Sequence, residues 1–475
     1  MAPTRRDFLR AAGCALGGAA LASTFESFGL MDAYAQTGSD YRALVCVFLN
    51  GGNDGNNMVV PLDPTGFAQY NNVRGAAGLA LAQSSLLPVN PPSQGRQFGF
   101  HPNMPEVQSL FNQGRLAVVC NTGPLVEPLT RSSYQSGVGK KPLQLFSHSD
   151  QINLWQTSVA NNVSQTGWGG RIADRMAAVN AASTFSHSIS IAGVSTFLTG
   201  NSTRQLAIAD AGTPLAGLLP LTMTGPPSDV ATRRAAFDLI RAADVSPTLV
   251  RAASDIRSGA IQTSQQLSQV AFRNFSTIFP ATAIARQLLQ VGRLIAERGR
   301  FGMKRQIFFV QAGGYDNHSN QRGTGAGTHD TLLQQLSQAL GAFNNLLTNE
   351  LGNPASGFFV GSDVTREVTV FTLSDFGRTL QPAGSGAGVG TDHGWGNHQL
   401  VMGGAVRGGD FYGNFPTLAL GGPDDTDNRG RWIPTISVEQ YAATLAAWYG
   451  LSTADFPAVF PLLDRFPTSN LGFML

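Results

Sequence analysis

Four short runs along the chain are wholly apolar and rich in β-branched residues, and each ends in a cluster of glycine and polar residues. Runs of this length that are apolar on both faces are typical of strands inside a sheet that is covered on both sides. We therefore predict four central strands within ALVCVFLNGGNDG (43–55), RLAVVCNTGP (115–124), RQIFFVQAGGYDNH (305–318) and EVTVFTLSDFGR (367–378).

Helical patterns, in which apolar residues recur every three or four positions, accompany these runs. Strands that alternate with helices predict a doubly wound α/β fold with a mostly parallel sheet. Ligands of such folds bind beyond the carboxyl ends of the strands, where the polar clusters of this chain stand. The predicted helices are MPEVQSLFNQG (104–114), ATAIARQLLQVGRLIAERG (281–299), TLLQQLSQALGAFNNLLTNEL (331–351) and VEQYAATLAAWYG (438–450).

The middle of the chain, residues 160–280, follows a different pattern. It contains a helix near GWGGRIADRMAAV, a candidate strand at SISIAGVSTFLTG and a long helical stretch that Ser246 and Pro247 interrupt. We interpret 160–280 as an inserted, largely helical cap that shapes access to the site, within one α/β domain over 36–475.

The N-terminal segment, residues 1–35, has the pattern of a twin-arginine export signal. Arg5 and Arg6 form the pair, and a mildly apolar stretch rich in glycine and alanine follows them. The letters AYA then place small residues before a cleavage site between Ala35 and Gln36. We expect the twin-arginine translocase to export the chain, already folded, so that the mature protein is periplasmic or secreted.

Two other interpretations of this segment agree less well with its residues. An ordinary amphipathic first helix would explain neither the arginine pair nor the cleavage pattern. A lipoprotein signal is also disfavoured, because Cys14 follows the arginines too closely and Ala11 stands where a larger aliphatic residue is needed. No later segment has the roughly 18 uninterrupted apolar residues of a membrane span, and so we expect a soluble extracytoplasmic product.

Composition narrows the functional classes. A hydrophobic content of 42% supports a substantial core, and a net charge of +2 without a run of Lys or Arg argues against nucleic-acid binding. Cys46 and Cys120 remain after cleavage, each within an apolar stretch. They suit buried free thiols better than a disulfide pair, and the protein is not a disulfide scaffold.

Polar residues gather in five clusters near the ends of the apolar runs. Four of the seven histidines lie in these clusters, a concentration that a random surface distribution would not give. The clusters are GGNDGNN with Asn53, Asp54, Asn56 and Asn57, FSHSDQ with Ser147, His148, Ser149 and Asp150, GGYDNHSNQ with Asp316 and His318, SDFGR with Asp375 and Arg378, and TDHGWGNH with Asp392, His393 and His398.

Aspartate and histidine side chains that converge from separate strands are how proteins build divalent-metal sites. Carboxylate and imidazole together suit zinc, manganese or iron, whereas oxygen-only sets suit magnesium or calcium. Each motif alone is a common turn or helix-cap composition, and Arg378 equally suits a structural salt bridge. His101 and His187 suit structural roles. The combination of five clusters favours a metal-centred site.

Five segments of the chain together resemble a family of twin-arginine-exported bacterial proteins, the domain-of-unknown-function family numbered fifteen-oh-one. They extend from about residue 41 to residue 415, and the resemblance therefore covers most of the mature chain. That family in turn resembles the alkaline-phosphatase-like superfamily of phosphatases, sulfatases and cofactor-independent phosphoglycerate mutases. The segments are FLNGGNDGNNMVVP, LFSHSDQINLWQ, GGYDNHSNQ, TLSDFGRT and GTDHGWGNHQLVMGGAVRGGDFYG.

The resemblance implies an alkaline-phosphatase-like α/β fold and a set of metal ligands. Asp54 corresponds to the aspartate after the first strand that holds one metal. Asp316 and His318 correspond to ligands of a second metal. Asp375 corresponds to the strand-ending aspartate that normally precedes a histidine, and His393 to the last histidine ligand.

Two points of the resemblance concern the chemistry of the reaction. Phe376 stands where the phosphatases place a histidine, and its side chain cannot coordinate a metal. The nucleophile is a serine of FSHSDQ, for which Ser147 is preferred over Ser149. His148 or Arg378 would then bind a non-bridging oxygen of the transferred group.

The resemblance also implies two kinds of metal site. The histidine-containing site suits zinc or manganese. The site near Asp54 and Asp375, which Asn53 or Asn57 could join, would either be rich in oxygen and suit calcium or magnesium, or be lost in this chain. A metal would lower the pKa of the serine hydroxyl and stabilise charge on the transferred group.

Two functions of different classes follow. The leading one is an exported metal-dependent hydrolase of small phosphate or sulfate esters, with a serine nucleophile beside an Asp/His metal site. The alternative is a non-catalytic extracytoplasmic binding or assembly protein that retains a structural metal. The absent histidine at position 376 favours the alternative, while the retained Asp and His clusters favour the enzyme.

Overall fold

The computed structural model describes residues 40–213, 226–242, 248–268, 270 and 272–475. The predicted export signal and its cleavage site lie outside the described residues. Within the described ranges, no helix is both long and apolar enough to cross a membrane.

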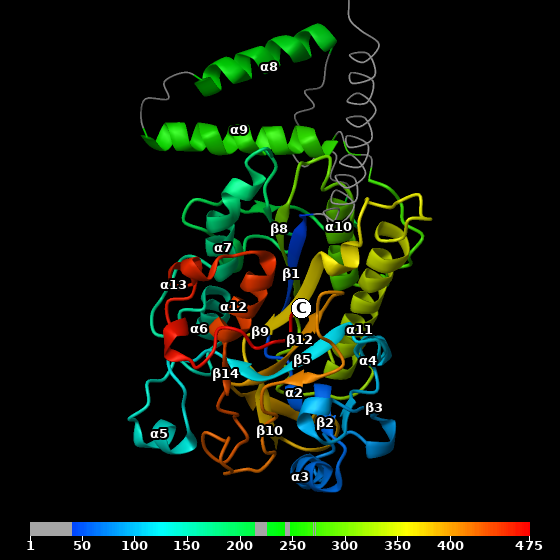
Figure 1. The fold of residues 1–475 in the computed structure, drawn as a ribbon, viewed down its shortest axis with the longest axis vertical. Helices are drawn as coiled ribbons and strands as arrows, with labels where there is room; N and C mark the ends of the chain where they lie inside the picture. Colours follow the sequence, from blue (N-terminus) through cyan, green and yellow to red (C-terminus); the bar gives the residue numbers. More distant parts are fainter. Residues whose placement is uncertain (1–39, 214–225, 243–247, 269, 271) are drawn as a thin grey trace, which may run out of the picture.

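A nine-stranded sheet forms the centre of the molecule (Figure 1). Neighbouring strands from β9 to β7 run parallel, and β12 runs antiparallel to both of its neighbours. The predicted doubly wound α/β fold with a mostly parallel sheet is therefore confirmed. In spatial order the strands are β13 (Phe411–Tyr412), β5 (Leu116–Gly123), β12 (Asn397–Met402), β9 (Val368–Ser374), β1 (Arg42–Leu49), β8 (Arg305–Ala312), β6 (Ser188–Ser190) and β7 (Leu206–Ala207), and β14 (Ile436–Ser437) pairs with β5.

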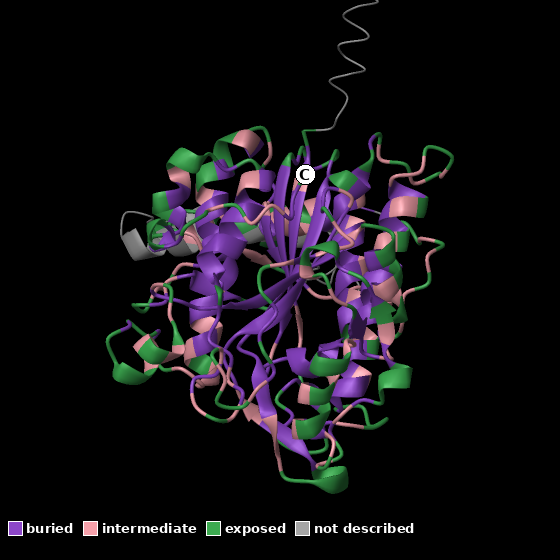
Figure 2. Cartoon of the chain, turned by 60° about the horizontal axis from the view of Figure 1, so that its bottom comes forward, coloured by how far each residue is buried: buried purple, intermediate pink, exposed green. Residues whose placement is uncertain are grey.

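Helices cover both faces of this sheet, as Figure 2 shows by the buried strands at its centre. The four helices predicted from apolar periodicity correspond to α4, α10, α11 and α12. One face is covered by α4 (Pro105–Asn112), α10 (Ala283–Ala296) and α11 (His329–Asn345), and the other by α6 (His148–Thr157), α7 (Trp168–Met176), α12 (Val438–Tyr449) and α13 (Phe456–Val459).

Strand β1 explains why the apolar runs become central strands. Val45 and Val47 pack into the core under α10 and α11, whereas Leu44 and Cys46 pack into the core under α7 and α12. Because successive side chains of a strand point to opposite faces, a strand between two helical layers must be apolar at every position. The same burial explains the free thiols, since Cys46 and Cys120 are both unpaired and buried, as predicted.

Smaller elements surround the carboxyl edge of the main sheet. Asp375 and the glycines near it lead from β9 into a hairpin that returns to β12. These elements are α2 (Gly55–Met58), α3 (Pro64–Arg74), α5 (Arg131–Ser136), the hairpin of β10 (Arg378–Ala383) and β11 (Gly390–His393), and the sheet of β2 (Val59–Pro61), β4 (Phe98–Phe100) and β3 (Leu87–Val89).

Residues 160–280 do not form a single cap. Their first part supplies α7 to one face of the sheet, and β6 and β7 extend the sheet itself. Only α8 (Pro227–Ala242) and α9 (Thr248–Ser268) lie outside the sheet and its covering layers (Figure 1). The predicted break at Ser246 and Pro247 lies outside the described residues.

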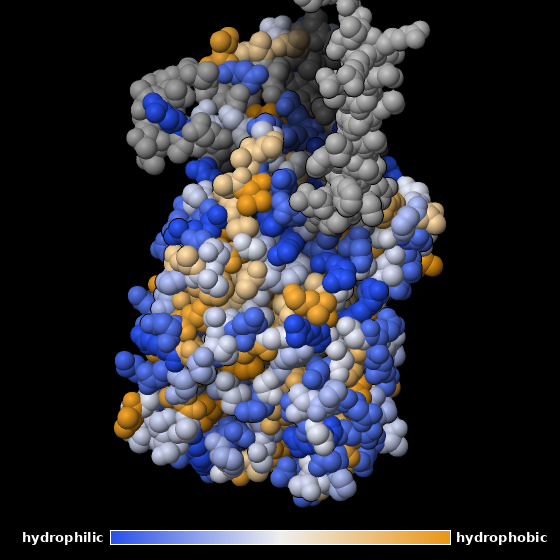
Figure 3. All heavy atoms as spheres, in the orientation of Figure 1, coloured by the Kyte–Doolittle hydropathy of each residue, from blue (hydrophilic) through white to orange (hydrophobic). Residues whose placement is uncertain are grey.

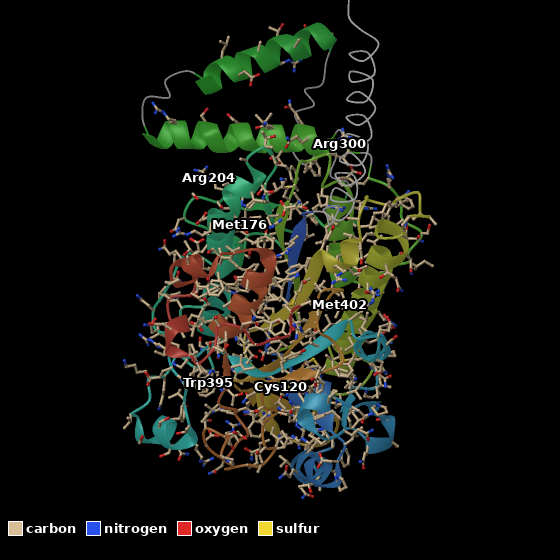
Figure 4. All side chains as sticks on the ribbon, viewed as in Figure 1. Cys120, Met176, Arg204, Arg300, Trp395 and Met402 are labelled. Carbon is tan, nitrogen blue, oxygen red and sulfur yellow. The ribbon has the colours of Figure 1, made fainter. Side chains whose placement is uncertain are left out.

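Helices α8 and α9 lie beyond the end of the sheet at which its parallel strands begin (Figure 1). Figure 4 marks this end with Arg300, which precedes β8, and places Trp395, which lies between β11 and β12, toward the opposite end. The candidate site residues lie at that opposite end. The expectation that an inserted helical cap shapes access to the site is therefore not met by α8 and α9.

The described surface is chemically mixed. In Figure 3 hydrophobic residues are scattered among hydrophilic ones over the main body of the molecule. Scattered apolar residues of this kind are usual on folded proteins and call for no functional explanation.

Candidate metal-binding site at the carboxyl edge of the sheet

Three side chains from distant parts of the chain converge at the carboxyl edge of the sheet. One ligand atom each of His148, Asp316 and His393 lies within 4.8 Å of the others. His148 is the first residue of α6, Asp316 follows β8, and His393 ends β11. The fold thus brings together residues that are between 77 and 245 positions apart, at the edge where the sequence predicted them.

His148 is oriented by a buried carboxylate. Its Nδ1 donates to Oδ2 of Asp375 over 2.7 Å, and this hydrogen bond raises the pKa of His148. Its Nε2 lies 3.3 Å from Oδ2 of Asp316, is shielded from solvent and has no hydrogen-bond partner among the described residues. A histidine that donates its far nitrogen to a carboxylate and directs a free nitrogen inward has the usual geometry of a metal ligand.

Asp375 has both oxygens engaged by the protein. It is fully buried after β9, and Oδ1 accepts from the backbone N–H of Gly51 over 2.9 Å. Oδ2 accepts from His148. The sequence predicted Asp375 as a metal ligand, but the structure places it behind His148, where it acts on the site through that imidazole.

His393 has its tautomer fixed by a backbone carbonyl. Its Nδ1 lies 2.7 Å from the oxygen of Phe146, which can only accept, so Nδ1 carries the hydrogen. Nε2 then has a lone pair directed at Oδ1 of Asp316, 3.4 Å away. Burial lowers the pKa of His393, which favours the neutral form that metals bind.

Asp316 is held by Arg378. The guanidinium donates to Oδ1 over 2.7 Å, and its other donors go to the carbonyl of Gly51 and to Thr391. Burial of Asp316 raises its pKa, but the hydrogen bond and charge of Arg378, together with the charges of His318 and His148, outweigh burial, so that the pKa is lowered. Arg378 is buried and occupied by these acceptors, so this arrangement matches the structural salt bridge considered as an alternative.

His318 lies on the outer side of the cluster. Its Nε2 is 2.8 Å from Nε2 of His393 and 3.1 Å from Oδ1 of Asp316. Its Nδ1 is 3.1 Å from Asp392, which also pairs with Arg429. The structure therefore brings His318 to the predicted site, with nearly half of its side chain open to solvent.

Asp54 lies apart from the converging ligand atoms. It was predicted to hold a metal, but Arg74 donates to both of its oxygens over 2.6 and 3.0 Å, and Gln321 donates to Oδ2 over 2.6 Å. Burial raises the pKa of Asp54, but the charge and hydrogen bonds of Arg74 outweigh burial and lower the pKa. The expectation of a metal at Asp54 is corrected to a buried ion pair.

Ser147 caps the helix that carries His148. Its Oγ donates to Oδ2 of Asp150 over 2.6 Å and lies 3.2 Å from Oγ of Ser149. Among the described residues, Ser147 Oγ forms no hydrogen bond to the His/Asp cluster. Phe376 contacts the cluster directly, since its ring stacks on that of His393 at 4.6 Å between centroids and lies tilted against that of His148 at 4.7 Å.

Other residues of the polar clusters have structural partners. His398 is buried, accepts from the backbone N–H of Asn121 and stacks on Phe415, and burial lowers its pKa to about 3. His329 pairs with Asn53 over 2.9 Å. These residues support the loops around the site and do not converge with its ligand atoms.

Phe146, Arg431 and Arg74 contribute to the site but were missed by sequence reasoning. Phe146 has a left-handed backbone with φ of 71°, and the guanidinium of Arg431 lies 4.2 Å from its ring. Arg431 also donates Nε to the carbonyl of His393 over 3.0 Å. The signal available in the sequence was weak, because the aromatic residue that begins FSHSDQ and single arginines are residue types that occur at many structural positions.

Comparison with known proteins gives the family of the chain. The family described as Protein of unknown function (DUF1501) matches residues 41–429. No curated protein sequence matches the chain at a significant level.

Three solved structures match the chain at low identity and low TM-score. One is a protein in the alkaline phosphatase superfamily from Vibrio parahaemolyticus, with 11% identity, a TM-score of 0.34, and coverage of 86% of this chain and 67% of that chain. Another is the PsFucS1 sulfatase from Pseudoalteromonas sp., with 10% identity, a TM-score of 0.31, and coverage of 94% and 72%. The third is the lipoteichoic acid synthase LtaP from Listeria monocytogenes, with 8% identity, a TM-score of 0.30, and coverage of 87% and 72%. Likeness at this level carries no argument about activity.

Proposed function

The chain belongs to the family of unknown function DUF1501, and on that premise we propose that it is an exported metal-dependent hydrolase of a phosphate or sulfate ester. The observation that carries this proposal is the convergence of His148, Asp316 and His393 within 4.8 Å. The twin-arginine pattern at Arg5 and Arg6 supports its export to the periplasm or beyond.

The residues of the cluster suit a divalent metal. The Nδ1 atoms of His148 and His393 each face an oxygen acceptor, so their Nε2 lone pairs are directed toward Asp316. The buried Nε2 of His148 has no hydrogen-bond partner among the described residues and lies 3.3 Å from Oδ2 of Asp316, an arrangement that suits a shared cation between them. Two imidazoles and one carboxylate suit zinc, manganese or iron.

A bound metal would act as a Lewis acid for negative charge on the transferred group. The protein's own residues would orient the metal ligands and bind the ester. Asp375 and the carbonyl of Phe146 orient the two imidazoles, and Arg378 holds Asp316 in place. His318, on the open side of the cluster, can donate a hydrogen bond to an oxygen of the ester.

Ser147 is the proposed nucleophile. Its Oγ attacks phosphorus or sulfur and passes its proton to Asp150, whose Oδ2 accepts a 2.6 Å hydrogen bond from that hydroxyl. The bond from phosphorus or sulfur to the leaving alcohol oxygen breaks, and that oxygen takes up the proton that Asp150 holds. Water then attacks the phosphorus or sulfur of the serine ester and gives a proton to Asp150. The bond to Oγ of Ser147 breaks, Oγ takes the proton from Asp150, and phosphate or sulfate is released.

A second candidate, a non-catalytic binding or assembly protein with a structural metal, is favoured by one observation. The hydroxyl of Ser147 has its hydrogen bonds within the first turn of α6 and none to the described His/Asp cluster. In that case the hydrogen bond from Ser147 to Asp150 would only join two side chains at the start of α6.

Metal analysis combined with aryl-phosphate and aryl-sulfate assays distinguishes the two functions. We expect metal in the wild type, its loss in His148→Ala, and at least about a 100-fold fall in kcat for Ser147→Ala with metal retained. Ser149→Ala is the matched control, because its exposed hydroxyl lies 3.4 Å from the same Asp150 oxygen. If the protein binds metal but hydrolyses neither ester, the result would support the second candidate, a non-catalytic binding or assembly protein.

A further inference from the structure

Arg74 is a fully buried arginine at the end of α3. Its relative exposure is 0%, although an arginine is almost never completely buried without a specific partner. The guanidinium extends under the β10–β11 hairpin, next to the residues that lead into the candidate metal site. The partner of this charge is Asp54, the residue that the sequence predicted as a metal ligand.

The guanidinium is surrounded by oxygen atoms. It donates to both oxygens of Asp54, at 2.6 and 3.0 Å, and to Oδ1 of Asn57 at 2.6 Å. It also donates to the backbone carbonyls of Thr379 and Leu380 at 2.8 and 3.0 Å. A set of carboxylate, amide and carbonyl oxygens is the environment that hard cations such as calcium and magnesium occupy in proteins.

The charge balance of this location is already complete. A buried carboxylate is costly unless an opposite charge and hydrogen bonds compensate it, and Arg74 supplies both to Asp54. A divalent ion at the same oxygens would have to displace a guanidinium whose own charge would then lie buried and unpaired. The guanidinium of Arg74 therefore already occupies the position that a cation would take among these oxygens.

We propose that the guanidinium of Arg74 takes the place of a second metal ion, so that Asp54 binds no metal and the chain holds at most one divalent cation. The single metal at His148, Asp316 and His393 is taken from the proposed function, and this part of the inference rests on it. The statement that Asp54 binds no metal does not depend on that function. The oxygen-rich calcium or magnesium site that the resemblance implied at Asp54 is therefore replaced by an internal cation.

Two sets of hydrogen bonds also connect Arg74 to the candidate site. Thr379 and Leu380, whose carbonyls it binds, follow Arg378 directly on β10. Gln321 bridges Asp54 to Thr391, and Thr391 accepts from Nε of Arg378. The internal cation therefore braces the strand and the arginine that hold Asp316, a role that a bound metal would otherwise fill.

Counting metals in the intact protein is the first test. Native mass spectrometry in the presence of manganese or calcium should show one ion in the wild type, one in Asp54→Asn and none in His148→Ala. Two ions in the wild type, with one lost in Asp54→Asn, would overturn the proposal. If neither the wild type nor either variant binds an ion, the metal of the proposed function would be ruled out. That result would still agree with the inference that Asp54 binds no metal.

Chemical replacement of the guanidinium is the second test, and it remains informative if Asp54→Asn does not fold. Arg74→Ala should have a lower Tm than the wild type, and millimolar calcium or ethylguanidinium should raise that Tm by about 4 °C or more. Neither should have this effect on the wild type, whose oxygens are occupied.

Arg171→Ala is the matched control for the calcium arm. Arg171 is also buried, but it donates only to carbonyl and hydroxyl oxygens, namely those of Thr157, Thr166 and Val459. Calcium should therefore not raise the Tm of Arg171→Ala. A folded Arg74→Ala whose Tm responds to neither cation would contradict the proposal.

Discussion

Phe146 shows how one strained residue helps to fix the geometry of the candidate site. A bulky residue at φ of 71° is an outlier that costs on the order of 1–3 kcal/mol and persists only when its surroundings determine it. Here its carbonyl accepts from Nδ1 of His393, and its ring lies under the guanidinium of Arg431. Arg431 in turn donates to the carbonyl of His393, so the three residues form a closed triangle.

Arg431→Gln should therefore weaken metal binding without unfolding the protein. It removes the cation from the ring of Phe146 and the donor from His393, and loss of such a supporting contact typically lowers metal affinity about 10–100-fold. Competition titration with a zinc chelator measures the affinity, and ¹⁵N chemical shifts report the tautomer of His393. Arg96→Gln, which removes an arginine from the ring of Phe98, is the control and should leave affinity unchanged. An equal affinity in both variants would contradict the role of Arg431.

The sequence could predict which residues lie at the candidate site, but it could not predict the role of each residue. Asp316 and His393 do meet His148, and His318 contacts His393, because polar residues that follow parallel strands share one edge of the sheet. Asp375 and Asp54 follow strands in the same way, yet one orients His148 and the other pairs with Arg74. Their roles depend on which cation or imidazole packs nearby, and an arginine at the end of a helix gives no sign in the sequence that it will be buried.

At the scale of elements, the turn after β1 brings the site together. Gly51 donates its N–H to Asp375 and accepts from Arg378 through its carbonyl, at 2.9 and 3.2 Å. Its φ is 117°, and an added Cβ would lie 2.4 Å from the backbone nitrogen of Asp316. Only glycine allows these backbones to approach so closely with this conformation.

Gly51→Ala is expected to reduce the free energy of unfolding by more than about 2 kcal/mol and to weaken metal binding, because the backbone before Asp316 must shift. Gly114→Ala is the control. Gly114 also has a positive φ, of 69°, but nothing lies within 4 Å of an added Cβ, so only about 1 kcal/mol of backbone strain is expected. Urea unfolding of both variants measures the difference, and equal losses would show that the close approach to Asp316 is unimportant.

Elements with long apolar runs were predicted as strands of the main sheet, whereas β6 was predicted only as a candidate strand within 160–280 and β7 was not predicted. β1, β5, β8 and β9 each have seven or eight residues and are buried along nearly their whole length, which gives a clear pattern. β6 and β7 have three and two residues, too few for periodicity to identify them as strands of the main sheet. This is why residues 160–280 resembled an inserted cap in the sequence.

At the scale of the whole molecule, the two helical layers bury charged groups as well as apolar ones. Glu439 lies in the first turn of α12, fully buried, and burial raises its pKa to about 8. The charges of Arg171 and Arg465 oppose this effect without offsetting it. The folded protein therefore retains a proton on Glu439 over a pH range in which the unfolded chain has released it.

This difference sets a pH dependence of stability. The folded pKa of about 8 lies above the ordinary value of 4.5, so the stabilising effect of the bound proton is complete below pH 4.5 and is lost as pH rises through 8. Glu439→Gln has nearly the same shape and cannot ionise. We expect Glu439→Gln to gain free energy of unfolding relative to the wild type as pH rises from 5 to 9, by as much as about 4 kcal/mol. Urea unfolding at several pH values measures this difference, and curves that stay parallel across the range would mean that Glu439 is ionised in the folded protein.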